Sequence, residues 1–313
     1  MRISTSWAQQ LSVNAMLNQQ AKVTNTQMQL STGLKNLTPA DDPIAAKKVL
    51  DIQERLDITA QFQENTEVAM SRNGLEGSVL MNSKEALLRA RDLAVQALNE
   101  GVLKQQDKTA IAEEIKQLKN HMLSLANTQD ANGEYIFSGA LSETPSFALD
   151  TSVPSNNKYY FYGSGVQREL QIAPERRIAD GDIGQDIFGN LPVIDSPAVG
   201  PGNILNTLGS FVDALEGALT PYHDSVNKAL ANIDTTLESI GNAEARVGAR
   251  LRALDDQTNQ NESYLLAMNT TLSEVKDLDY AEAISRFEMD SAILQASQQS
   301  YTKVKSLSLF NYL

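Results

Sequence analysis

The chain has 313 residues, of which 42% are hydrophobic and 6% aromatic, so it can bury a sizeable and chiefly aliphatic core. It has no cysteine, which excludes disulfides and cysteine-ligated metals, and no run of 18 apolar residues that could span a membrane. The first 40 residues carry +3 and those after Asp290 carry +2, so the total of −13 leaves −18 on residues 41–290. An acidic body without a basic patch argues against nucleic acid as a partner.

Residues 4–32 are rich in uncharged polar side chains, because 17 of them are Ser, Thr, Asn or Gln. The apolar residues in this stretch form a thin and irregular helical stripe, made of Trp7, Leu11, Val13, Leu17, Val23, Met28 and Leu30. Such a helix would be marginal alone, since it buries little apolar surface and its polar side chains compete for backbone hydrogen bonds. We expect it to order only against neighbouring helices; the alternative is a frayed tail without a role.

Two longer helices are predicted after a short break. Gly33 is placed to end the first helix, and Asp42 followed by Pro43 has the order of a cap and a first helical residue. Apolar residues at helical spacing then predict helices over 43–98 and about 104–129, separated by a break at 99–101. Asp41 and Asp42 are interpreted as a cap and its neighbour rather than as a catalytic pair.

The stretch from 130 to 203 changes character, since it holds most of the prolines and loses the helical repeat. The aromatic run 159–162 leads through Gly163 and Gly165 into an alternating segment, 166–172, which predicts a hairpin. The aromatic side chains are interpreted as packing a small sheet onto the helices, with a ligand-stacking surface as the alternative. A short helix over 204–219 follows.

The most regular part of the chain is 221–276, where apolar residues repeat at spacings of four and three without a slip in phase. Twelve of the fifteen positions are aliphatic or Met, in the series Val226, Leu230, Ile233, Leu237, Ile240, Glu244, Val247, Leu251, Leu254, Thr258, Asn261, Leu265, Met268, Leu272 and Val275. Thr220 and Pro221 would start this helix. A repeat of 3.5 residues is typical of a helix that wraps partners, and the helix would be about 84 Å long, which predicts an elongated protein.

A last helix is predicted to begin at a capping box made by Asp279 and Glu282. Its stripe restarts one residue out of phase, as Tyr280, Ile284, Phe287, Ser291, Leu294, Gln298 and Tyr301, which indicates a hinge at 277–279. Residues 307–313 are strongly apolar and are interpreted as an assembly surface, because exposed apolar ends promote aggregation unless they are covered.

No catalytic, cofactor or metal site is predicted. The two histidines, His121 and His223, lie in separate helical segments without the spacing of metal ligands, and no phosphate-binding loop or nucleophile elbow is present. We therefore expect no enzyme activity and no cofactor.

Three sets of residues resemble the flagellin superfamily. Residues 29–34 (QLSTGL) resemble its N-terminal signature, and residues 245–251 (ARVGARL) and 278–283 (LDYAEA) resemble its C-terminal signatures. Three features favour the hook-filament junction branch over flagellin proper: residues 40–46 (ADDPIAA), residues 132–139 (NGEYIFSG) and the ending LFNYL. Ala40 departs from the serine usual in the first of these. The segment 145–202 carries little of the resemblance.

The resemblance implies a mainly α, elongated, coiled-coil-like bundle with paired terminal helices and a small inserted β subdomain. The expected domains are a terminal assembly domain (1–40 and 277–313), a central helical bundle (41–139 and 203–276) and a β-rich outer insertion (140–202). It also implies a structural adapter outside the cell, at the junction of hook and filament. The N-terminus has no apolar signal stretch, so the chain either stays inside the cell or leaves by a route that needs no cleaved signal peptide. The resemblance implies export through the flagellar type III apparatus.

The partners implied by the resemblance are a hook-associated protein on the hook side, flagellin on the filament side, an export chaperone of the FlgN type at the C-terminal region, and copies of the chain itself in a ring or tubular layer. Neither nucleic acid nor membrane is expected. The predicted assembly residues are Trp7, Leu11, Leu17, Leu30, Ile284, Phe287, Leu294, Tyr301, Val304, Leu307, Phe310 and Leu313. Two alternatives are a flagellin filament subunit and a stalked surface- or carbohydrate-binding module.

Overall fold

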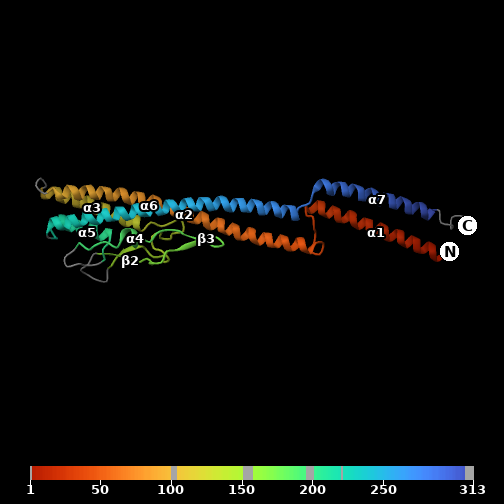
Figure 1. Ribbon diagram of the computed structural model, residues 1–313, viewed down its shortest axis with the longest axis horizontal. Helices are drawn as coiled ribbons and strands as arrows, with labels where there is room; N and C mark the ends of the chain where they lie inside the picture. Colours follow the sequence, from red (N-terminus) through yellow and green to blue (C-terminus); the bar gives the residue numbers. More distant parts are fainter. Residues whose placement is uncertain (1, 100–103, 151–157, 195–200, 220, 307–313) are drawn as a thin grey trace. The chain divides into compact units, whose positions relative to one another are not determined.

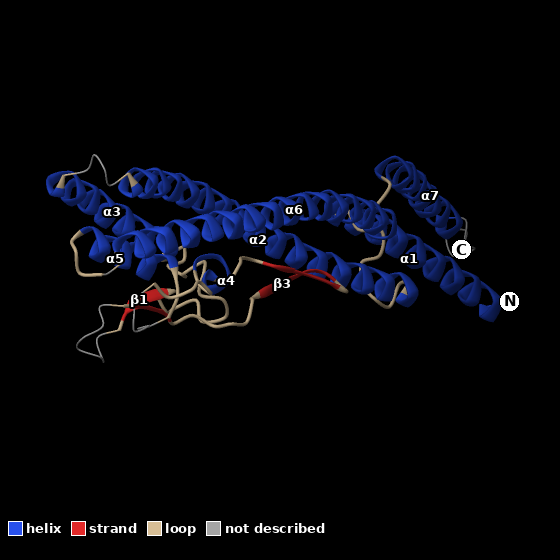
Figure 2. Cartoon of the chain, turned by 60° about the vertical axis from the view of Figure 1, so that its left-hand side comes forward, coloured by secondary structure: helices blue, strands red, loops and turns tan. Residues whose placement is uncertain are grey.

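The computed structural model describes residues 2–99, 104–150, 158–194, 201–219 and 221–306, and these are mainly helical, as predicted (Figures 1 and 2). The helices are α1 (Arg2–Thr32), α2 (Pro43–Leu98), α3 (Gln105–Ala126), α4 (Gly184–Phe188), α5 (Ile204–Leu215), α6 (Tyr222–Lys276) and α7 (Tyr280–Ser306). The strands are β1 (Phe147–Leu149), β2 (Tyr159–Phe161), β3 (Glu169–Ala173) and β4 (Arg176–Ala179). Within these described ranges no helix is both long and apolar enough to cross a bilayer.

The long helices begin and end close to where the sequence predicts. The cap of α2 is confirmed, because Asp42 Oδ1 accepts hydrogen bonds from the backbone N–H groups of Ile44 (3.1 Å) and Ala45 (3.0 Å). Gly33 ends α1 with φ of +70°, a conformation that glycine adopts without strain. Thr220, the predicted cap of α6, lies outside the described residues.

The chain divides into two compact units. The first contains Met1–Thr59 and Glu262–Leu313, and the second contains Ala60–Asn261. The division into three domains stays a prediction, since the second unit holds the insertion together with the helices on which it packs.

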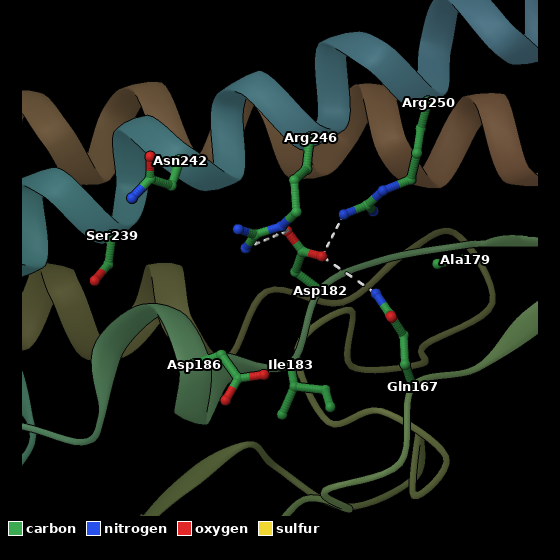
Figure 3. Close-up of a pocket in the computed structure, with 9 residues that line it drawn as sticks. All are labelled: Gln167, Ala179, Asp182, Ile183, Asp186, Ser239, Asn242, Arg246 and Arg250. Carbon is green, nitrogen blue, oxygen red and sulfur yellow. Dashed lines mark hydrogen bonds and ion pairs between the residues drawn. The ribbon is translucent and has the colours of Figure 1, made fainter.

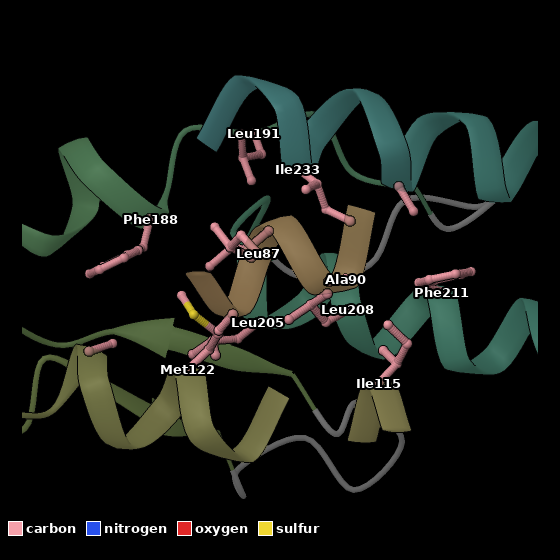
Figure 4. Close-up of a cluster of buried hydrophobic side chains, with 14 of the residues drawn as sticks. Leu87, Ala90, Ile115, Met122, Phe188, Leu191, Leu205, Leu208, Phe211 and Ile233 are labelled. Carbon is pink, nitrogen blue, oxygen red and sulfur yellow. The ribbon is translucent and has the colours of Figure 1, made fainter. Parts of the chain in front are cut away.

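The core of the second unit lies between α2, α3, α5 and α6 (Figure 4). Leu87, Ile115, Leu205 and Ile233, one from each helix, are completely buried. The predicted stripe of α6 is correct, because all fifteen of its positions are buried or half-buried. Burying such side chains stabilises the unit by about 1.5–3 kcal/mol each.

The predicted hairpin between 159–163 and 166–172 is wrong. Strand β2 pairs with the earlier strand β1, and β3 pairs with β4, both antiparallel. The segment between β2 and β3 instead joins the turn after α3: Ser164 donates to the backbone oxygen of Ser138 (2.8 Å), and Ala140 donates to that of Val166 (3.0 Å). These bonds use the backbone that the hairpin would have needed.

The aromatic side chains of β2 pack inward, which confirms the packing interpretation. The ring of Phe161 lies 5.5 Å from that of Phe147, and both Tyr159 and Phe161 contact the main core. Tyr162, just after β2, is 45% exposed. Tyr159 and Phe161 therefore pack toward the helices, whereas Tyr160 is half-buried outside the core cluster and Tyr162 is exposed.

Candidate assembly surface

Helices α1 and α7 of the first unit run side by side and antiparallel, so that the start of α1 and the end of α7 lie together (Figures 1 and 2). The face of α1 toward α7 repeats at spacings of three and four and is half-buried at Val13, Met16 and Val23 and buried at Thr26. Gln19 lies on this face and donates to Asp290 of α7, at 2.8 Å to Oδ1 and 3.2 Å to the backbone oxygen. The pairing of the terminal helices is confirmed, and it has a polar seam.

The other faces of both helices expose large apolar side chains. Trp7 is 67% exposed, and the other exposed members are Leu11, Leu17 and Met28 on α1 and Tyr280, Ile284, Met289 and Ile293 on α7. Helical spacing places Tyr280 and Ile284 on the opposite side of α7 from Met289 and Ile293, so these residues are spread over the exposed faces of the pair. Large exposed apolar side chains in this number make the pair a candidate interaction surface. We call these eight residues the outer stripe.

The predicted assembly residues fall into three groups. Trp7, Leu11, Leu17 and Ile284 belong to the outer stripe. Leu30, Phe287, Leu294 and Tyr301 are half-buried. Val304 lies in α7, and Leu307, Phe310 and Leu313 lie outside the described residues. Their role in assembly stays a prediction.

Three positions of the predicted α7 stripe, Tyr280, Ile284 and Gln298, are exposed in the single chain, whereas the other four are half-buried. The packed face instead includes Ala283, which is completely buried. A small side chain contributes little to an apolar pattern but allows two helices to approach closely, so the sequence pattern favoured the larger neighbour.

The connections at the inner end of the pair bond to each other. Leu278 donates to the backbone oxygen of Gly33 (2.9 Å), and Lys35 donates to that of Lys276 (2.9 Å). Leu34 and Asp277 form the isolated antiparallel bridge between these bonds. The predicted break at 277–279 is therefore confirmed, and it is matched by the break after α1. We call this pair of connections the double linker.

Only half of the predicted capping box forms at the start of α7. Asp279 Oδ1 accepts hydrogen bonds from the backbone N–H groups of Ala281 (2.9 Å) and Glu282 (3.2 Å). The carboxylate of Glu282 pairs instead with Arg286 one turn later, at 2.6 Å. Asp279 therefore satisfies two of the first four backbone N–H groups of α7, which have no hydrogen-bond partner within the helix.

Replacing Gly33 with alanine is expected to destabilise the first unit by about 1–2 kcal/mol, because alanine resists positive φ. Its Cβ would also lie 2.9 Å from Tyr280 Oη. The double variant Gly33→Ala with Tyr280→Phe should recover the part of the lost stability that comes from the clash with the Tyr280 hydroxyl. Tyr280→Phe alone should leave the stability unchanged. Thermal unfolding followed by the fluorescence of Trp7, the single tryptophan, measures this. Wild-type stability of Gly33→Ala would contradict it.

A buried charge network holds the insertion on the helices of the second unit. Arg72 of α2 is 5% exposed and pairs with Asp130, with Glu134 (2.8 Å) and with Asp180 (3.2 Å). Arg168 pairs with two of these acids, at 2.6 Å from Asp180 and 2.8 Å from Glu134. The acids come from the turn after α3 and from the end of β4, so the network joins segments far apart in the chain.

A second cluster of the network surrounds Asp182 (Figure 3). Arg246 and Arg250 of α6 both pair with the Asp182 carboxylate, the former at 3.0 Å, and Arg250 also donates to Asn73 (2.9 Å). Glu76 of α2 accepts from the backbone N–H of Asp182 (3.1 Å). The two arginines lie in the segment ARVGARL, which the sequence analysis singled out by resemblance without assigning this role.

Glu76 is the unusual member of this cluster. It is 1% exposed, and its Oε2 has no hydrogen-bond partner among the described residues. Burial, reinforced by the nearby Asp182 carboxylate, raises the pKa of Glu76 to about 8. Arg250 Nη1 lies 3.5 Å from Glu76 Oε2 and opposes this rise, but the raised pKa still favours the protonated carboxyl at neutral pH. Nothing in the sequence marks Glu76 for this role, because it occupies an ordinary helical position.

Comparison with known proteins agrees with these features. The model of the bacterial flagellin N-terminal helical region matches residues 3–142. The chain is 29% identical to flagellar hook-associated protein 3 of Escherichia coli (strain K12), over 99% of this chain and 99% of that protein. The chain is therefore similar to members of the flagellin superfamily.

Similarity within the superfamily is uneven. Flagellin of Bacillus subtilis (strain 168) is 23% identical, over 95% of this chain and 94% of that one. The crystal structure of the flagellar junction protein FlgL from Legionella pneumophila covers 74% of this chain and 100% of its own, with a TM-score of 0.57 and 21% identity, which shows a shared fold. The chain is thus similar over nearly its whole length to flagellar proteins, and more similar to hook-associated protein 3 than to that flagellin.

Proposed function

We propose that this chain is a structural adapter of the bacterial flagellum, which joins a hook-associated protein on the hook side to the flagellin filament. The observation that carries the proposal is the outer stripe on α1 and α7, because large apolar side chains on paired helices need a covering partner. The similarity to hook-associated protein 3 over nearly all of both chains supports it.

Assembly would proceed by burying the outer stripe against neighbouring subunits. Among the described side chains of α1 and α7 only Thr26 and Ala283 are buried, so this pair has little core of its own. Such a pair of helices gains most of its stability from contacts with a partner. Ordering the two helices costs conformational entropy, and without a partner nothing offsets this cost. This cost would keep free subunits from polymerising early.

The remaining roles follow from the same proposal. Copies of the chain would associate in a ring or tubular layer, with the terminal helices innermost. The chain would be exported by the flagellar type III route, and a chaperone of the FlgN type would cover the apolar residues 307–313 until assembly. It would have no catalytic activity, and neither nucleic acid nor a membrane would be a partner.

The rival in the same class is a flagellin filament subunit. The lower identity to Bacillus subtilis flagellin, 23% against 29% for hook-associated protein 3, favours the adapter. The binding-module alternative receives less support from β2, because Tyr159 and Phe161 contact the core and are not available for a ligand.

Removing residues 304–313 is expected to leave a soluble, helical monomer that does not restore motility to cells lacking the native chain. The deletion removes an apolar segment that assembly would bury, and touches little of the described packing. Circular dichroism and size-exclusion chromatography measure folding, and swimming assays measure assembly.

A matched pair of variants controls for the loss of chain length. Changing Leu307 and Phe310 to serine should also abolish motility. Changing Leu88 and Val95, which are 47% and 44% exposed on α2 of the second unit, to serine should leave it intact. The proposed function is overturned if the truncated chain still supports filament growth.

A further inference from the structure

The double linker lies beside an apolar groove of about 510 Å³ in the first unit. Its side chains come from the connection after α1, the first turns of α2 and the end of α6, and include Leu37, Pro39, Ala46, Val49, Leu50 and Val275. Leu50 is 66% exposed, so the groove is open. The volume lies in the range of sites that bind compact ligands, roughly 300–1,000 Å³.

The groove is held in shape by bonds that need no occupant. Lys35 is tied to Lys276 by a backbone hydrogen bond of 2.9 Å across the double linker. The backbone N–H of Thr38 donates to Asp41 Oδ2 (2.7 Å), and the backbone N–H of Asp41 donates to the backbone oxygen of Thr38 (3.1 Å). Pro39 fixes its own backbone inside this turn. A preformed apolar groove binds without paying for its own ordering.

We infer that this groove receives the apolar residues 307–313 of a neighbouring copy of the chain. The inference rests on the proposed function, since it names the place where one subunit meets the next. Five of those seven residues are Leu, Phe or Tyr and none is charged, so the segment matches an apolar groove. The outer stripe, by contrast, lies on helix surfaces and suits another helix.

The length of α7 decides that the occupant comes from another copy. This helix starts beside the double linker and has 27 residues, so its end at Ser306 lies about 40 Å from its start. The seven residues that follow span at most about 25 Å when fully extended. They cannot return to the groove of their own chain.

The chain has no cysteine, so introduced cysteines give an unambiguous test. Two single variants, Leu50→Cys and Phe310→Cys, are produced together in cells that lack the native chain, and isolated flagella are oxidised. A disulfide between them can form only between copies. The control replaces Leu50→Cys with Met81→Cys, because Met81 on α2 of the second unit is similarly exposed, at 61%.

Leu50→Cys with Phe310→Cys is expected to give at least about ten times more cross-linked dimer than the control pair, since docking raises the local thiol concentration. Equal yields from the two pairs would overturn the inference. Motile cells that yield no cross-linked dimer would also overturn the inference. The same result is expected if another protein fills the groove. Cells in which the wild-type chain fails to restore motility would refute the proposed function instead, so the two failures are distinguishable.

Discussion

Replacing Arg72 with methionine is expected to lower the free energy of unfolding of the second unit by about 3–5 kcal/mol, because it leaves buried carboxylates without their counter-charge. Asp130 and Asp180 are 9% and 3% exposed, and both pair with Arg72. The loss should exceed that of a typical surface change several-fold. Urea unfolding followed by circular dichroism measures it.

Arg91 provides the matched control on the same helix. Its guanidinium lies 2.6 Å from Asp234, but the two side chains are 43% and 47% exposed. Water screens such a pair, so Arg91→Met should cost less than about 1 kcal/mol. Equal losses for Arg72→Met and Arg91→Met would show that the buried network contributes no more to stability than a surface pair.

Replacing Glu76 with glutamine is expected to make the protein more stable at neutral and alkaline pH, by about 3–5 kcal/mol at pH 9. The pKa of Glu76 rises from 4.5 to about 8 on folding. The folded state therefore binds more protons than the unfolded state between these two values, and stability falls as pH rises through this window. Glutamine resembles the protonated acid and does not titrate, so the variant should lose this part of the pH dependence.

The measurement is urea unfolding of both proteins at pH 5, 7 and 9. The difference in stability should be small at pH 5 and largest at pH 9, because the contribution of the protonated Glu76 is complete below pH 4.5 and lost above pH 8. Glu64→Gln, at an exposed position on the same helix, should follow the wild-type curve. If Glu76→Gln also follows the wild-type curve, the pKa of Glu76 does not differ between the folded and unfolded states.

The sequence alone determined where the long helices lie and which face of α6 packs. The 3.5-residue repeat of α6 placed every member of its stripe on the packed side, and Asp42 with Pro43 located the start of α2. These features are local: spacing along one helix defines its buried face, and a cap depends on residues one turn away. The same pattern identified Trp7, Leu11 and Leu17 as apolar residues of α1.

Only the tertiary structure decided which distant groups meet. The partner of β2, the bonds of the double linker and the carboxylates around Arg72 join residues far apart in the sequence, and each partner looks ordinary where it stands. Ala283 was missed because a small side chain carries no apolar signal. Spacing along the chain specifies which side of a helix is apolar, whereas contact between remote residues depends on how the chain closes in three dimensions.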